Sequence, residues 1–366
     1  MTKNKLLALA LAGAMLTGQS LYACTGIAFK TEDGTAIAGR SIEWGYYDLN
    51  SKLVIMPRGV DFQSYTSEGK KNGLKWKGKY GFTGVALVYE DFIGEGVNEA
   101  GLNAGMFYFS GYGSLSKYNP KKASKSLADM YLVSWILSNF STVEEVKANL
   151  PKVTVVPIGY EKDGQPLPTA HWRVTDAKGG NIVIEITDGG KVNIYDNKAG
   201  VFTNSPEFPW HITNLNNYVN LETGTAKNRK MGDIELKSLG GTSSLLGLPG
   251  DYTPPSRFVR AFFALHSAPK AKTAVAGIKQ GFQILKAFTI PIGEEFAPGQ
   301  EAPNIPSATQ WTAFSNLSGK EFYYTTMYNP TIRKIDLNKI DFSTVKKYVL
   351  PLENKTDPGF QEIYFN

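Results

Sequence analysis

Short runs in which apolar and polar residues alternate occur along most of the chain after position 24. A period of two is typical of strands that bury one face. The turn Asp188-Gly189-Gly190 separates two such runs and predicts a β-hairpin. The pattern predicts strands at 25–30, 36–39, Lys52–Met56, 81–90, Asn181–Thr187, Lys191–Asp196, 321–328 and 331–337.

Helical spacing of apolar residues appears in two separate regions. Segment 126–140 is followed at once by a second helix, at which Ser141 and Glu144 fit a capping box. Segments 256–266 and 273–288 form the later pair. Strands therefore alternate with pairs of helices, which predicts an α+β protein whose sheets are covered by helices on their outer faces. Because no repeat or linker interrupts residues 24–366, we expect a single domain there.

The first 23 residues have the pattern of a secretory signal peptide. Lys3 and Lys5 precede an apolar run at 6–16, and small and polar residues follow it up to Ala23. The run is too short to cross a bilayer. We expect residues 1–23 to be removed on export, to a periplasm or the exterior, so that the mature chain begins at Cys24. No later stretch predicts a membrane span.

Composition changes this picture little. The net charge of +6, with 42% hydrophobic and 20% charged residues, is ordinary for a globular protein. The lysine-rich run at 69–80 indicates a solvated hairpin or loop and is too short to predict nucleic-acid binding. We expect no nucleic-acid partner.

Cys24 is the only cysteine, so it cannot form an internal disulfide. Three interpretations compete. It is a buried thiol without a role, or it is the lipid-attachment site of a lipoprotein, since residues 21–24 (LYAC) look like a bacterial lipobox with a bulky Tyr22. The third interpretation is an N-terminal nucleophile, because cleavage after Ala23 frees an α-amine that can act as a base near neutral pH.

Several other chemistries lack the residues they need. His171, His211 and His266 lie in no metal-ligand spacing and are interpreted as structural or surface residues. Neither the phosphate-binding loop Gly-x-x-x-x-Gly-Lys-Ser/Thr nor a Gly-x-Gly-x-x-Gly motif at the start of a helix occurs, so nucleotide binding lacks support. A serine nucleophile would need a Gly-x-Ser-x-Gly elbow, and none is present. The sequence therefore predicts no metal and no organic cofactor.

Four polar residues stand in marked contexts that fit a cysteine nucleophile. A strand, a turn and a returning strand would bring Arg40 and Glu43 beside Cys24, where Arg40 favours the thiolate and Glu43 accepts a hydrogen bond from the amine. Asn204 offers an amide that can donate to an oxyanion. Arg257 opens a predicted helix. Taken alone, each residue is better explained as a turn residue or as part of a surface ion pair.

Taken in order, the motifs resemble the choloylglycine hydrolase family, which includes conjugated bile-salt hydrolases and penicillin V acylases. The segments that carry the resemblance are CTGIAF, AGRSIEW, MPRG, GVNEAGLN, SNFSTVEEV, VFTNSPEFPWHITNLNNY, GLPGDYTPPSRF and FYYTTMYN, spread over most of the chain after residue 23.

The resemblance implies the four-layer αββα sandwich of N-terminal-nucleophile hydrolases and hydrolysis of a linear amide through a cysteinyl acyl-enzyme. It implies Cys24 as nucleophile, with its own amine as base, assisted by Arg40. Asn204 would contribute to the oxyanion hole and Arg257 would complete the charged network. The chain has Glu43 where the family usually has Asp.

Tyr108 stands where bile-salt hydrolases tend to have Asn and penicillin V acylases tend to have Tyr. Its backbone N–H suits the oxyanion hole, and its side chain favours penicillin V-like aromatic acyl amides. Bile salts and N-acyl homoserine lactones remain alternative substrates.

The long segment 219–246 corresponds to one that packs between subunits in the family, which predicts a homotetramer. The rival to the enzyme is a non-catalytic lipoprotein anchored through Cys24.

Overall fold

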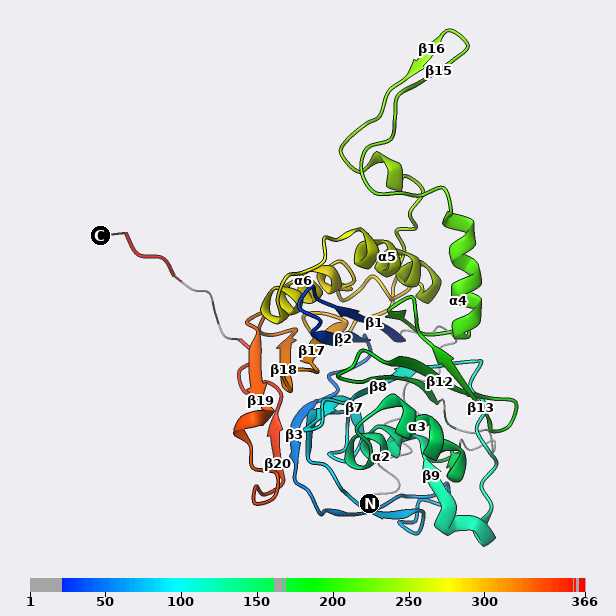
Figure 1. Cartoon of the computed structure of the whole chain (residues 1–366), viewed down its shortest axis with the longest axis vertical. Coiled ribbons are helices and arrows are strands. Elements are labelled where there is room, and N and C mark those ends of the chain that lie inside the picture. Colours follow the sequence, from blue (N-terminus) through cyan, green and yellow to red (C-terminus); the bar gives the residue numbers. More distant parts are fainter. Residues whose placement is uncertain (1–21, 161–166, 168, 358, 360–361, 366) are drawn as a thin grey trace.

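The computed structural model describes residues 22–160, 167, 169–357, 359 and 362–365. The predicted signal peptide lies almost entirely outside these residues, at 1–21. Within the described residues, two antiparallel sheets face each other with helices outside them (Figure 1).

One sheet has six strands, in the order β14-β1-β2-β17-β18-β19, within the described part of the chain. Its strands are β1 (Tyr22–Lys30), β2 (Ala36–Trp44), β14 (Val201–Phe202), β17 (Thr309–Asn316), β18 (Glu321–Thr326) and β19 (Arg333–Asp336). Helices α5 (Pro254–Ser267) and α6 (Ala274–Lys286) pack on its outer face. The apolar side chains Phe258, Ile278 and Phe282 of these helices are buried there.

The second sheet has eight described strands, in the order β13-β12-β11-β8-β7-β6-β3-β20. They are β3 (Lys52–Met56), β6 (Phe82–Ala86), β7 (Ile93–Asn98), β8 (Asn103–Tyr108), β11 (Ala170–Thr175), β12 (Asn181–Thr187), β13 (Lys191–Asp196) and β20 (Tyr348–Pro351). Helix α2 (Leu132–Asn139) covers β7 and β8, with α3 (Val143–Asn149) beside it. The predicted αββα architecture is confirmed.

Smaller elements complete the fold. Two short hairpins are β4 (Asp61–Gln63) with β5 (Lys75–Lys77) and β15 (Arg229–Met231) with β16 (Ile234–Leu236). The lysine-rich run contributes β5, as expected for a hairpin arm. Strands β9 (Ser126–Ala128) and β10 (Thr154–Val156) pair in parallel, and α4 (Phe208–Asn214) precedes the projecting β15–β16 hairpin.

Two predictions on helices are wrong in detail. The expected helix at 126–140 begins only at Leu132, because Ser126–Ala128 form β9 and pair with β10. The expected capping box is displaced by one residue. The Thr142 hydroxyl accepts from the Glu145 backbone N–H, and the Glu145 carboxylate accepts from the Ser141 backbone N–H. Among the described residues, no helix is both long and apolar enough to cross a membrane.

Candidate active site

Cys24 lies near the start of β1, on a central strand of the six-stranded sheet. Its side chain is buried, and its backbone N–H donates to Asn204 Oδ1 over 2.7 Å. Ala23 precedes it in the same strand and is paired with Glu43, so the nitrogen of Cys24 is a peptide nitrogen here. The thiol is therefore held in a fixed backbone environment, among residues from both sheets.

Gly26 explains why the strand that carries Cys24 can approach the second sheet. A Cβ at this position would lie 2.7 Å from Arg173 Nη1 and 2.7 Å from the ring of Phe107, closer than real Cβ atoms come. Any side chain here would push the sheets apart. The close approach brings the backbone of Tyr108, at the end of β8, to the thiol of Cys24.

Arg40 returns beside Cys24 because β1 and β2 form the predicted hairpin, in which Gly26 pairs with Arg40 and Cys24 with Ile42. The guanidinium is fully buried. Its Nη1 donates to the Met106 and Gly94 carbonyls, and it stacks 4.2 Å from the Phe107 ring centroid. Its Nη2 has no hydrogen-bond partner among the described residues. That donor fits a thiolate or another anion at the site.

Asn204 and Arg257 complete one hydrogen-bonded network around Cys24. Arg257 in the first turn of α5 donates to the Cys24 carbonyl, to Thr25 Oγ1 over 2.9 Å and to Asn204 Oδ1 over 2.8 Å. The Asn204 amide nitrogen donates to the Tyr108 carbonyl over 2.9 Å. That contact uses one of its two hydrogens, so the second can serve an oxyanion. His211 holds the backbone of Asn204 by donating from Nε2 to its carbonyl over 2.9 Å.

Glu43 lies opposite Ala23 and is buried, yet neither carboxylate oxygen has a hydrogen-bond partner of good geometry among the described residues. Burial raises its pKa to about 7, although Arg257, the Ser41 hydroxyl, Arg40 and the Thr309 hydroxyl act in the opposite direction. An acceptor without a donor in a buried site is costly. A free α-amine on Cys24 would supply donors at this end of the strand.

The electrostatics of Cys24 favour the neutral thiol in the chain that carries Ala23. Burial raises its pKa most, and the carboxylate of Glu43 also raises it. Arg40, Arg257 and a hydrogen bond from the Tyr108 backbone lower it. Two cations and one donor thus face the sulfur. Groups of this kind stabilise a thiolate.

The structure therefore brings together all six residues singled out from the sequence. They are Cys24, Arg40, Glu43, Tyr108, Asn204 and Arg257. The arrangement can support nucleophilic attack by sulfur, with an amide and a backbone N–H beside it for an oxyanion. The roles of the individual residues remain predictions.

Three charged residues near this centre, two of them buried and one half-buried, were not found from the sequence. Arg173 on β11 donates to Glu95 Oε1 over 2.9 Å and to the Gly39 carbonyl over 2.8 Å, which links the two sheets behind Cys24. Glu295, in the loop between α6 and β17, faces Glu43 and Arg257. Alone in the sequence, none differs from a surface charge, and the only signal would have been its burial.

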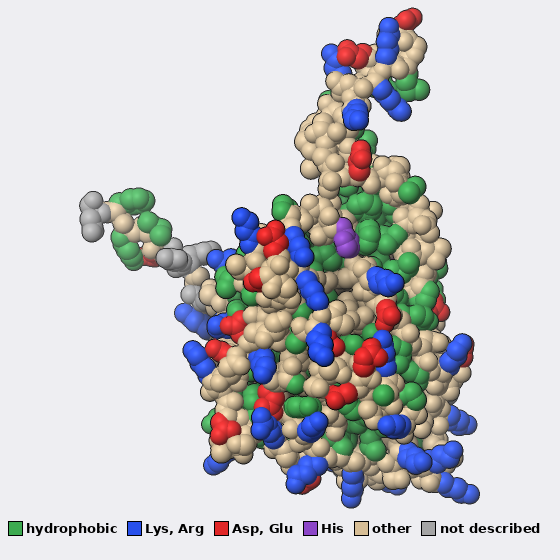
Figure 2. Space-filling model, viewed as in Figure 1, with side chains coloured by type: hydrophobic (Ala, Val, Ile, Leu, Met, Phe, Trp, Pro, Cys, Tyr) green, Lys and Arg blue, Asp and Glu red, His purple; other side chains and the backbone are tan. Residues whose placement is uncertain are grey.

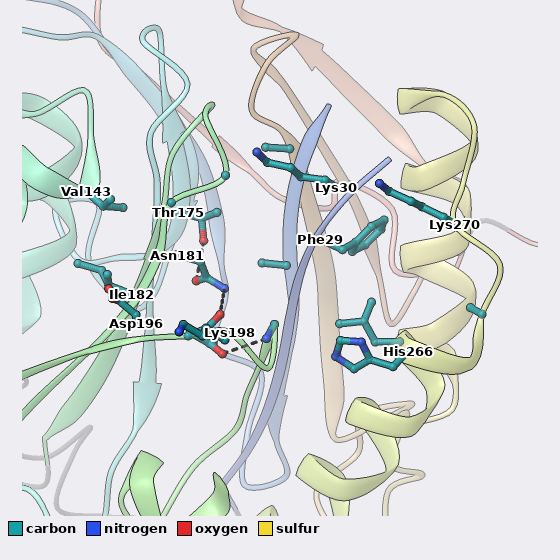
Figure 3. A pocket seen from close by; sticks show the side chains of 18 of the residues that line it. Phe29, Lys30, Val143, Thr175, Asn181, Ile182, Asp196, Lys198, His266 and Lys270 are labelled. Atoms are coloured by element: carbon teal, nitrogen blue, oxygen red, sulfur yellow. Dashed lines mark hydrogen bonds between the residues drawn. The ribbon is translucent and has the colours of Figure 1, made fainter. Parts of the chain in front are cut away.

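A cavity of about 730 Å³ opens elsewhere, at the other end of β1. Figure 3 shows its walls, with Phe29 and Lys30 from β1, Asn181 from β12, and His266 from α5. Cys24 does not line it, so size alone does not identify the reactive site.

Among the described residues, no group of three or more His, Cys, Asp or Glu side chains could hold a metal ion. The histidines instead bond to neighbouring backbone carbonyls, at Thr203, Asn204 and Ala199.

Comparison with known proteins agrees with this geometry. Residues 24–350 match the family of linear amide C–N hydrolases, choloylglycine hydrolase family. The chain is 34% identical over 329 residues to a bile salt hydrolase/transferase of Clostridium perfringens, covering 89% of this chain and 96% of the relative. It is 26% identical to a penicillin V acylase of Pectobacterium atrosepticum, covering 93% and 88% of the two chains.

Solved structures give the same result. A variant of the conjugated bile acid hydrolase from Clostridium perfringens superposes with a TM-score of 0.78 at 31% identity, covering 93% of this chain and all of that one. A penicillin V acylase from Agrobacterium tumefaciens gives 0.72 at 26% identity, with 90% and 92% coverage. The fold, the cysteine-centred site and the match over residues 24–350 lead to one conclusion: the chain belongs to the choloylglycine hydrolase family, and it is an amide hydrolase with the N-terminal-nucleophile fold.

Proposed function

We propose that the chain is an exported cysteine amidase that cleaves a linear amide through an acyl-enzyme on Cys24. The observation that carries this proposal is the set of contacts at one residue. Cys24 Sγ faces Arg40, Arg257 and the backbone N–H of Tyr108. The backbone N–H of Cys24 donates a hydrogen bond to Asn204 Oδ1. A thiol and its own amine at a chain terminus form a nucleophile and base without a histidine.

The reaction would proceed in two steps. The Cys24 thiolate attacks the substrate carbonyl, and Asn204 Nδ2 with the Tyr108 backbone N–H hold the oxyanion. The Cys24 ammonium gives its proton to the leaving amine as the C–N bond breaks. The neutral amine then takes a proton from water, which attacks the thioester and releases the acid and the free thiol.

Processing after Ala23 is part of this proposal. With Ala23 attached, the nitrogen of Cys24 is an amide, which is not a base. Ala23 also fills space beside Cys24, packing against Ile290 and Ala308 with Tyr252 and Ile292 around it. Because Ala23 and Cys24 are both buried in β1, we place the cleavage before this strand pairs. A signal peptidase acting during export would meet that requirement.

The test compares three chains. A chain that begins at Cys24 should hydrolyse penicillin V or glycocholate, and the same chain with Cys24→Ala should not. A chain that retains Ala23 should be inactive although its fold is intact by circular dichroism. Activity of the Cys24→Ala chain at the rate of the parent would overturn the nucleophile. A lipid on Cys24 in the exported protein would support the lipoprotein alternative, because that thiol could not react.

We further propose a preference for aromatic acyl groups like that of penicillin V. Tyr108 is half-buried beside Cys24, and burial raises the pKa of its phenol. Tyr46 lies near Tyr108, and Trp44 stacks edge-on with Tyr46 and Tyr47 at 6.3 and 5.5 Å. Aromatic rings pack favourably against other aromatic rings, so an aromatic acyl group suits a site beside these side chains. Tyr108→Asn should lower the ratio of penicillin V to glycocholate hydrolysis, and an unchanged ratio would remove this basis for the preference.

A homotetramer is the assembly we propose. Segment 219–246 projects from the body of the molecule, and the β15–β16 hairpin forms the tip of this projection (Figure 1). Figure 2 shows that this projection carries apolar as well as charged side chains. A surface of this kind is typical of contacts between chains. By the family resemblance, this segment corresponds to one that is expected to pack between subunits.

A further inference from the structure

Glu295 has a carboxylate oxygen buried without a donor. The residue lies in the loop that joins α6 to β17, and its Oε2 has no hydrogen-bond partner among the described residues. This oxygen sits over Gly45, where a Cβ would come within 2.5 Å of it. The side chain is therefore packed against the end of β2, two residues beyond Glu43. A surface glutamate would instead reach into solvent.

Glu43, which is buried, and Glu295, which is half-buried, form a pair of neighbouring acids. Both oxygens of Glu43 also lack a hydrogen-bond partner of good geometry, so three buried carboxylate oxygens have no well-placed donor among the described residues. The cation that faces both acids is Arg257, but its described hydrogen bonds go to Cys24, Thr25, Asn204 and Tyr252. Arg257 therefore interacts with the two carboxyl groups through electrostatic attraction and not through any of these hydrogen bonds.

The charges around the pair come from several elements. Burial first, and then the negative charge of Glu43, raise the pKa of Glu295 to about 7, while Arg257 lowers it. The other titratable or charged groups that face this cluster are Cys24 on β1, Arg40 on β2, Arg260 on α5, and Tyr252 with Glu294 at its rim.

We propose that Glu295 is a positioning residue that acts through Glu43, and that the coupled pair sets the pH at which the Cys24 centre becomes active. The proposal rests on the proposed function, in which Glu43 must be charged to hold the amine of Cys24. The charge of Glu43 raises the pKa of Glu295. Because repulsion between two carboxylates is mutual, a charge on Glu295 opposes ionisation of Glu43 by the same free energy. The charge of Glu43 in turn raises the pKa of the Cys24 thiol.

The test uses the chain that begins at Cys24 and the isosteric change Glu295→Gln. Removing the second ionisable carboxyl lets Glu43 ionise at lower pH. We expect the acidic limb of the kcat/KM profile to move to lower pH by roughly 0.5–1 unit, the size of a moderate like-charge effect. The pH dependence of Cys24 alkylation by iodoacetamide, which needs no turnover, should also change, because the pKa of the thiol depends on the charge of Glu43. Glu295→Asp, which keeps the charge, should retain the parent profile.

Glu294→Gln is the matched control, since Glu294 is the exposed neighbour on the same loop. The proposal is overturned if Glu295→Gln leaves both profiles in place, or if Glu294→Gln moves them equally. It is also overturned if Glu295→Gln lowers activity equally at every pH with the alkylation profile unchanged, because that is a structural effect. If Glu295→Gln does not fold, the decision passes to Glu295→Asp, for which a displaced limb contradicts the proposal. Failure of the proposed function itself is recognised separately, by activity in Cys24→Ala.

Discussion

The backbone nitrogen of Cys24 and the side-chain oxygen of Asn204 are 2.7 Å apart, although 180 positions separate the residues in the chain. The same oxygen accepts from Arg257, and the amide nitrogen donates to the Tyr108 carbonyl. Asn204 thus joins the start of β1, the end of β8 and the first turn of α5. One side chain fixes the position of the proposed nucleophile relative to the proposed oxyanion donors.

Replacement of Asn204 should therefore affect the chemical step. Asn204→Ala removes the amide donor, and we expect kcat/KM to fall by about 10²–10³-fold, as when an oxyanion-hole donor is lost. Asn204→Asp keeps the oxygen that contacts Cys24 and Arg257 but lacks the donor. It should lose activity to a similar extent, with melting closer to that of the parent. Activity of Asn204→Asp at the parent rate would show that the amide donor is not needed.

Burial of Glu43 should make stability depend on pH in the chain that retains Ala23. The pKa of Glu43 rises from an ordinary 4.5 to about 7 on folding, so the folded state binds more protons within that window. Stability should then fall as pH rises from about 4.5 to 7, by up to about 3 kcal/mol from this group. Glu43→Gln should reduce that fall in urea unfolding at the two ends of the window.

The exposed Glu222 provides the control, because Glu222→Gln should leave the pH dependence of unfolding unchanged. In the chain that begins at Cys24, the nearby ammonium should lower the pKa of Glu43 and flatten the profile. Equal pH dependence in the parent and in Glu43→Gln would contradict the assignment of a raised pKa to this carboxyl.

Local pattern was enough to predict much of the fold. The bounds of β3, β12 and β13 agree with the predicted strands, because β3 is a short apolar run that follows polar residues and a glycine turn separates β12 from β13. The start of α2 does not agree, since residues 126–131 have helical spacing but Ser126–Ala128 pair with a strand nearly thirty residues later. A pairing between distant segments leaves no trace in a local window.

The site was predictable to the extent that a hairpin or a family resemblance reached it. Arg40 and Glu43 follow from the return of β2 along β1, which spacing alone suggests. Asn204 and Arg257 come from distant segments, and only the resemblance placed them beside Cys24. Glu295 was missed because its loop has no periodic pattern, and its importance depends on what it packs against.

The buried ion pair behind Cys24 should be a major source of stability. Arg173 and Glu95 are almost fully enclosed, and their contact is 2.9 Å. Arg173→Met leaves the carboxyl of Glu95 buried without its cation, and we expect a loss of about 3–5 kcal/mol in the free energy of unfolding. The double change Arg173→Met with Glu95→Gln should recover part of this loss, because no charge is then left uncompensated.

Urea unfolding measures these values, and Arg58 offers the comparison. Arg58 also pairs with a glutamate, Glu99, but its side chain is 52% exposed. Arg58→Met should therefore change stability less, since Arg58 itself lies largely in water and the Glu99 carboxylate still accepts from the Gly81 backbone N–H. A loss for Arg173→Met no larger than that for Arg58→Met would mean that the inter-sheet pair does not stabilise the fold.

The projecting segment predicts how assembly can be separated from folding. Its apolar side chains are largely exposed, notably Val219, Met231, Ile234, Leu239 and Leu246. They add nothing to the core of their own chain, whereas burial against a second copy would be favourable. Met231→Glu with Ile234→Glu should therefore reduce the mass seen in sedimentation equilibrium from that of a tetramer while leaving the thermal unfolding of the body unchanged. Lys230→Gln, on the same hairpin and also exposed, should retain the parent mass. A doubly substituted chain with the parent mass would exclude the hairpin tip from the subunit contact, and a parent chain that sediments as a monomer would overturn the tetramer itself.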